Sequence, residues 1–97
     1  MACYTIGHIT IHNMDGYKVY AAQVPATIAA HGGEYLCRGG DYSVLEGEMK
    51  NDRHVVLKWP SRAVAEGWYN SAEYQAIIQH RLDNSSGDMI MVDGYEG

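Results

Sequence analysis

The spacing of apolar and polar positions changes along the first third of the chain. Residues 2–11 are rich in β-branched and aromatic side chains that alternate with a period of two, which predicts a strand partly covered on both faces. Apolar side chains then recur every three or four positions and predict a helix: Tyr17, Tyr20, Ala21, Val24 and Ile28. Asn13 is suited to cap this helix and Gly32-Gly33 to end it. Pro25 lacks an N–H and crowds the preceding turn, so we expect a kink or a restart there.

The middle of the chain predicts two further strands. We expect residues 34–38 and 42–47 to form one strand with a bulge or tight bend at Gly39-Gly40. After a polar turn, residues 54–59 have the apolar density of a central strand.

The last part predicts a helix in two pieces and a final strand. Pro60 stops the preceding strand, and Ser61 is suited to cap a helix. The first piece places Val64, Ala65, Trp68 and Tyr69 on one face. Ser71 is suited to cap a second piece, which carries Tyr74, Ile77, Ile78 and Arg81 toward one side. Residues 83–87 are polar enough for a loop, and residues 89–92 form the last predicted strand.

The resulting order is strand, helix, strand, strand, helix, strand, which is the ferredoxin-like βαββαβ pattern of the α+β class. It implies a four-stranded antiparallel sheet with helices on one face only. The chain of 97 residues has room for one domain, so we expect residues 1–97 to form a single domain. A second copy of the sheet is the simplest cover for the open face, so we also expect a homodimer.

Composition and charge exclude several classes of function. Seven basic against twelve acidic residues give a net charge of −5, and the basic residues are scattered, so nucleic-acid binding is not expected. No apolar run is long enough to span a bilayer, and no membrane association is expected. The first residues lack a basic segment followed by a long apolar stretch, which favours the cytoplasm. Cys3 and Cys37 lie in apolar strand-like segments and are expected to be buried, free thiols that are not bonded to each other.

Several segments together resemble a known family. They are Tyr4-Thr5-Ile6-Gly7-His8-Ile9, Tyr17-Lys18-Val19-Tyr20, Val24-Pro25, the run from Ile28 to Leu36, Arg38-Gly39-Gly40, Val44-Leu45-Glu46-Gly47, Trp59-Pro60-Ser61, and the run from Trp68 to Tyr74. With these residues the chain resembles the domain-of-unknown-function family 1330 of the dimeric α/β-barrel superfamily, nearly from end to end.

The resemblance implies a homodimer in which two sheets pack face to face into a barrel. It implies no single reaction, because relatives in the superfamily include cofactor-free oxygenases of aromatic polyketides, lactone isomerases, polyketide cyclases and haem-using enzymes.

Arg38 is the first candidate for ligand binding. It closes an apolar strand segment and precedes two glycines that allow close approach of a ligand, so it is suited to bind an anion. The alternative is a structural ion pair with Glu46 or Glu34. His31 stands at a helix end, where it either interacts with the last carbonyls or acts as a general acid or base.

His8 is a second candidate for proton transfer if its strand face lines a pocket, and a hydrogen-bonded histidine if that face meets a partner. His54 and His80 fall at the ends of predicted elements and are expected to be solvated. His8 and His12 are about 13 Å apart along a strand, so one metal ion cannot join them and no metal site is expected.

A cluster of polar-tipped aromatic residues marks the break between the two helical pieces. It consists of Trp68, Tyr69 and Tyr74, with Ser71 between them. These side chains are candidates for a ligand-binding wall, although aromatic residues at helical spacing are also typical of a core and Ser71 of a helix cap. We expect Arg38 and at least one of His31, Tyr69 and Tyr74 to line a common pocket.

Three functions remain open. The first is a small enzyme or binder without a cofactor, of the isomerase, cyclase or monooxygenase type, that takes a small anionic or aromatic organic molecule and acts by proton transfer or oxygenation. The second is a non-catalytic dimeric binding or regulatory module. The third is a haem protein with His31 or His80 as axial ligand.

Overall fold

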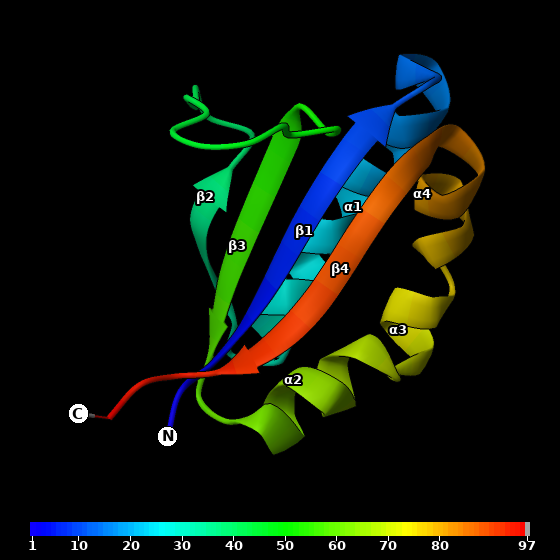
Figure 1. The fold of residues 1–97 in the computed structure, drawn as a ribbon. Helices are drawn as coiled ribbons and strands as arrows, with labels where there is room; N and C mark the ends of the chain where they lie inside the picture. The colour runs from blue at the N-terminus through cyan, green and yellow to red at the C-terminus, as the bar shows by residue number, and fades with distance from the viewer. Residues whose placement is uncertain (97) are drawn as a thin grey trace.

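The computed structural model describes residues 1–96, which form four strands and four helices in one layered arrangement (Figure 1). In chain order these elements are β1 (Cys3–Ile11), α1 (Met14–Ala30), β2 (Glu34–Arg38), β3 (Arg53–Trp59), α2 (Arg62–Tyr69), α3 (Ala72–Gln75), α4 (Ile78–Asn84) and β4 (Ser85–Asp93).

The four strands form one antiparallel sheet in the order β2-β3-β1-β4. The helices lie on one side of this sheet, with α1 running behind the strands in Figure 1. This is the ferredoxin-like α+β fold that the sequence predicts. Because β3 separates β1 from β2, Cys3 and Cys37 lie on strands that are not neighbours, and both thiols are free as expected.

Side chains along β1 alternate between the two faces of the sheet. Cys3, Thr5 and Ile9 are buried toward the helices, while Tyr4, Ile6 and His8 are only half-buried on the opposite side. We call this opposite side the outer face. Its side chains include Tyr4, Ile6 and His8 of β1, His54 and Val56 of β3, and Ile90 and Val92 of β4.

Aromatic side chains fill the core between sheet and helices. The ring centroid of Trp68 lies 4.8 Å from that of Trp59 and 4.1 Å from that of Tyr74, and all three side chains are almost completely buried. Both indole N–H groups find threonine hydroxyls, because Trp59 donates to Thr5 and Trp68 to Thr27.

The predicted helix caps are confirmed. The side chains of Asn13, Ser61 and Ser71 each accept a hydrogen bond from a backbone N–H in the first turn of the helix that follows. The chain leaves α1 through Gly32, whose φ of 75° suits glycine. The expected restart at Pro25 is wrong, because α1 continues through it as one helix.

Two predictions about the connections are wrong. Residues 42–47 form no strand, because the chain turns away at Gly39 (φ 67°) and β3 begins only at Arg53, which leaves this segment without a strand to pair with. Residues 83–87 form no separate loop, because α4 runs to Asn84 and β4 starts directly at Ser85, where it pairs with Ile11.

The region after α2 and the thiol of Cys37 also differ from expectation. The second helical piece is itself divided into α3 and α4 by a turn around Ile77. Cys37 is exposed rather than buried, because β2 is an edge strand and the thiol lies on the outer face opposite Val56.

Candidate functional site

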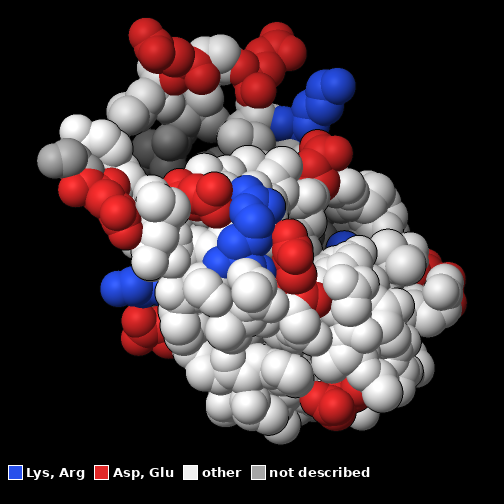
Figure 2. Space-filling view, turned by 90° about the horizontal axis from the view of Figure 1, so that it is seen from below, with Lys and Arg blue, Asp and Glu red and all other residues white. Residues whose placement is uncertain are grey.

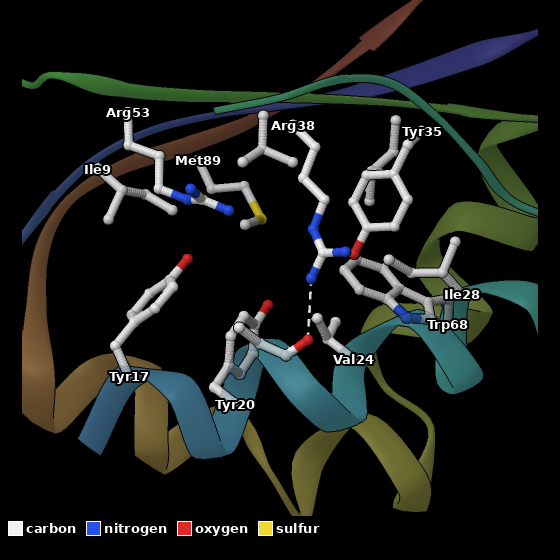
Figure 3. A pocket seen from close by; sticks show the side chains of 13 residues that line it. Ile9, Tyr17, Tyr20, Val24, Ile28, Tyr35, Arg38, Arg53, Trp68 and Met89 are labelled. Atoms are coloured by element: carbon white, nitrogen blue, oxygen red, sulfur yellow. Dashed lines mark hydrogen bonds between the residues drawn. The ribbon is translucent and has the colours of Figure 1, made fainter. Parts of the chain in front are cut away.

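A narrow pocket lies between the sheet and α1 (Figure 3). Its cavity volume is about 30 Å³. The lining residues come from all four strands and from α1 and α2: Ile9, Tyr17, Tyr20, Ala21, Val24, Ile28, Tyr35, Arg38, Arg53, Val55, Leu57, Trp68 and Met89. The pocket is therefore a narrow slot with mostly apolar walls, and we refer to it below as the slot.

Arg38 reaches the pocket from the end of β2. Its Nη2 donates a hydrogen bond of 2.9 Å to the carbonyl oxygen of Ala21, and its guanidinium lies over the ring of Tyr35. The carbonyl of Ala21 is open because the residue four positions later is Pro25, which has no N–H to donate. Pro25 and Arg38 are thus complementary, since the guanidinium takes the place of the missing backbone donor.

Arg38 has none of the ionic partners considered from the sequence. Within residues 1–96 it forms no ion pair with Glu34, Glu46 or any other carboxylate. As a whole residue it is exposed rather than buried, because it closes an edge strand at the mouth of the pocket.

Arg53 is the second cation of the pocket and comes from the start of β3. Its guanidinium lies 5.7 Å from the ring centroid of Tyr17 and directly against Gly39, where a larger residue would collide with it. Its Nε is buried, and no hydrogen-bond partner for this atom lies in the described part of the chain. A buried donor of this kind favours a ligand that accepts hydrogen bonds.

The charges around the slot are of one sign. Figure 3 shows Arg38 and Arg53 extending from the sheet, opposite Tyr17 and Tyr20 on α1. The lining residues, all within 1–96, include no Asp, Glu, His or Cys. The slot therefore combines two guanidinium groups with aromatic walls and lacks any carboxylate to neutralise them.

The residues of the predicted aromatic cluster take different places. Trp68 lines the slot together with Arg38, whereas Tyr69 lies at the edge of β4 and Ser71 is occupied as the cap of α3. Tyr74 does not line the slot, but its hydroxyl is 2.8 Å from that of Tyr20, which does. The expectation that Arg38 shares its pocket with His31, Tyr69 or Tyr74 is therefore wrong, because α2 presents Trp68 there instead.

The two candidate catalytic histidines lie elsewhere. His31 follows α1 and donates from Nε2 to the Glu73 carboxylate at 3.0 Å, a bond that holds the pKa of Glu73 below its ordinary value. His8 lies on the outer face, where its Nδ1 is 2.9 Å from Nδ1 of His54. His54 is thus hydrogen-bonded and half-buried rather than solvated as expected, and Tyr42 packs edge-on against its ring.

An open hollow accompanies the His8–His54 pair on the outer face. It is lined mainly by the segment between β2 and β3 and admits the centre of a water molecule over about 450 Å³. Although this hollow is larger than the slot, no Lys or Arg side chain lines it. We regard the slot as the candidate site because two guanidinium groups line it.

Sequence reasoning missed Arg53, Tyr17 and Tyr20 as site residues. The register of β3 carried a usable signal, since Arg53 has the same parity as Val55, Leu57 and Trp59 and therefore faces the helices. A charged residue in phase with core positions is a candidate for a pocket. The two tyrosines looked like ordinary members of an apolar helical stripe.

Charge elsewhere on the surface is mixed. Figure 2 shows acidic and basic side chains scattered over the face seen from below, without a continuous basic patch. In the described range 1–96, no three His, Cys, Asp or Glu side chains gather as metal ligands. Among the same residues, no helix has both the length and the apolar character needed to cross a membrane.

The fold and slot define a ferredoxin-like α+β protein with a cationic pocket beneath its sheet. Residues 2–95 match the family described as "Domain of unknown function (DUF1330)", and the chain belongs to this family. No curated protein matches the chain.

Solved structures of similar fold extend the comparison. A protein of unknown function from Rhodopseudomonas palustris has a TM-score of 0.77 at 14% identity, over 99% of this chain and 84% of that one. A dimeric ferredoxin-like protein of unknown function from a Jannaschia species has 0.69 at 11% identity, over 98% and 99%. SnoaB, a cofactor-independent oxygenase from Streptomyces nogalater, has 0.66 at 12% identity, over 99% and 95%. At these identities the likeness concerns the fold.

Proposed function

We propose that this protein binds a small, planar organic anion in the slot between the sheet and α1. The observation that carries the proposal is the pair of guanidinium groups, Arg38 and Arg53, in a slot whose lining contains no carboxylate. Arg38 and Arg53 hold the anionic oxygens, and Trp68 and Tyr35 provide flat walls. The narrowness of the slot favours a single aromatic ring or a similarly thin molecule over a bulky ligand.

Binding of benzoate, followed by calorimetry, tests this proposal. Arg53→Ala should weaken binding by about 2–5 kcal/mol, because it removes one side of a desolvated charged contact. Arg38→Ala should weaken binding less, because Arg38 is exposed at the mouth of the pocket. Arg62→Ala is the matched control, since Arg62 is an exposed arginine that pairs with Asp93 away from the slot. Its removal should leave the affinity unchanged.

Two outcomes would overturn the proposal. One is that the wild-type protein binds neither benzoate nor a related planar carboxylate such as cinnamate. The other is that Arg38→Ala and Arg53→Ala lower the melting temperature while binding persists, which would make both arginines structural.

The structure supports a second candidate function, an enzyme without a cofactor that transforms the bound anion. The supporting observation is the hydroxyl of Tyr20, which faces the same slot as the two guanidinium groups. A similar fold serves SnoaB as a cofactor-independent oxygenase. In either function His31 and His8 have no role in the slot, because neither lines it. The haem alternative gains no support from the slot, because neither His31 nor His80 lines it.

We also propose that the chain forms a single domain that pairs with a second copy through the outer face. The supporting observations are the apolar side chains left uncovered there, with Ile90 and Val92 50% and 41% exposed, and the adjoining Leu45, which is 93% exposed. The Jannaschia protein of the same fold is dimeric. The free thiol of Cys37 at the surface suits a reducing compartment such as the cytoplasm.

A further inference from the structure

A second layer of polar groups lies behind the slot. The hydroxyl of Tyr20 is 2.8 Å from the hydroxyl of Tyr74, and both side chains are buried, with Tyr74 completely inaccessible. Tyr20 lines the slot, whereas Tyr74 lies behind it on α3. The two rings meet nearly edge to face, which fixes the relative position of their hydroxyls.

Arg81 ends this row of groups on the side away from the slot. Its guanidinium lies 5.9 Å from the ring centroid of Tyr20, and its Nε is buried without a hydrogen-bond partner among residues 1–96. No carboxylate within residues 1–96 forms an ion pair with it. Either hydroxyl can donate in the Tyr20–Tyr74 bond, and in the arrangement in which Tyr74 donates, Tyr20 keeps its own O–H.

This arrangement leaves the proton of Tyr20 free to point into the slot. Because the Tyr20 oxygen accepts from Tyr74, its own O–H remains available as a donor. Burial raises the pKa of both phenols, so they stay protonated at neutral pH and keep their donor function. Arg38 and Arg53 line the same slot from its sheet side. A ligand that lies between these arginines and Tyr20 therefore meets hydrogen-bond donors at two separate places.

We propose that Tyr20, backed by Tyr74, stabilises a second oxyanion on the ligand, so that the slot selects planar carboxylates that also carry an ionisable phenol or enol. This inference rests on the proposed function and names its ligand class. The ligand O–H bond breaks, the electron pair stays on the ligand oxygen, and the proton leaves to solvent water, because no base lines the slot. The oxyanion then accepts a hydrogen bond from Tyr20.

The probe 4-hydroxy-3-nitrobenzoate tests the proposal, because the visible absorbance of its phenolate reports ionisation while it is bound. The wild-type protein should bind the ionised form about tenfold more tightly than the neutral form, as a charge-assisted hydrogen bond does relative to a neutral one. The O-methylated probe, 4-methoxy-3-nitrobenzoate, cannot ionise there and should bind at least tenfold more weakly than the phenolate.

Three substitutions separate the roles of these tyrosines. Tyr20→Phe should abolish the preference for the ionised form, because the variant has no hydroxyl to donate to the oxyanion. Tyr74→Phe should reduce the preference severalfold, because Tyr74 acts through Tyr20 as a positioning residue. Tyr95→Phe is the control, because Tyr95 is 96% exposed and should leave both properties unchanged.

The outcomes distinguish this inference from the proposed function. If benzoate binds but the wild-type protein shows no preference for the phenolate over the methylated probe, the second oxyanion site is refuted and the anion site stands. The same conclusion follows if Tyr20→Phe retains the full preference. If neither benzoate nor the nitrophenol binds, both proposals fail together.

Discussion

At the scale of single residues, the buried tyrosines make stability depend on alkaline pH. Burial raises the pKa of Tyr20 above the value of about 10 expected in the unfolded chain. Below that value both states keep the proton, and above it the unfolded chain releases a proton that the folded chain retains. The free energy of unfolding should therefore fall as pH rises above about 10, by up to about 1.4 kcal/mol per pH unit for each such tyrosine.

Urea denaturation between about pH 9 and 11 measures this effect. In Tyr20→Phe the free energy of unfolding should fall less steeply with pH, because the contribution of one buried tyrosine is removed. This difference in slope is expected whatever the substitution does to stability at neutral pH. Tyr95→Phe should follow the wild-type curve, because Tyr95 is almost fully exposed. An unchanged slope in Tyr20→Phe would contradict the assignment of the raised pKa.

Single residues were predictable from the sequence where their role is local. Asn13, Ser61 and Ser71 act on backbone groups a few positions away, so the cap pattern sufficed. The partner of Arg38 is the carbonyl of Ala21, which lies 17 positions earlier in the chain. That contact depends on how β2 packs against α1, and local pattern holds no information about it.

At the scale of elements, α1 continues through Pro25, and Arg38 of β2 supplies the hydrogen bond to the Ala21 carbonyl that Pro25 cannot donate. If Arg38 replaces the donor that Pro25 lacks, the two residues are energetically coupled. Arg38→Ala should lower the free energy of unfolding by about 0.5–1.5 kcal/mol in the wild-type chain. In the Pro25→Ala background the effect should be smaller, because the new backbone N–H bonds the Ala21 carbonyl itself.

A double-mutant cycle followed by chemical denaturation measures this coupling. The matched cycle of Pro25→Ala with Arg62→Ala should show no coupling, since Arg62 is paired with Asp93 instead. Equal losses from Arg38→Ala in both backgrounds would refute the idea that Arg38 supports the helix.

The elements that the sequence predicts correctly are those in which burial imposes a regular spacing of apolar residues. β1 and β3 are central strands, and the stripe of α1 faces the core, so their patterns are regular. Residues 42–47 have strand-like composition but no neighbouring strand, and composition alone does not reveal whether a partner exists.

At the scale of the whole molecule, the order of elements was enough to predict the fold but not the slot. Connection rules leave few ways to arrange two helices and four antiparallel strands. The slot, by contrast, depends on one charged residue of β3, Arg53, meeting Arg38 of β2 above the tyrosines of α1. Such a meeting of side chains from separate elements follows from the packed structure rather than from any segment.

The uncovered outer face bears on the assembly of the whole molecule. Ile90 lies opposite Ile6 in the register of β4 with β1, and Val56 flanks Ile6 on the other side. These apolar side chains belong together in the middle of the sheet, where a second copy would cover them. A lysine placed there would lose its hydration on association.

Sedimentation at micromolar concentration should therefore report twice the chain mass for the wild-type protein and a single chain mass for Ile90→Lys. The matched control is Leu82→Lys, since Leu82 is also 50% exposed but lies on α4, on the helical side of the molecule. That variant should remain a dimer. A monomeric wild-type protein, or dissociation by Leu82→Lys but not by Ile90→Lys, would show that the sheet faces do not form the interface. Because Arg38 and Arg53 lie on the helical side of the sheet, benzoate binding by the Ile90→Lys monomer should persist, which separates assembly from ligand binding.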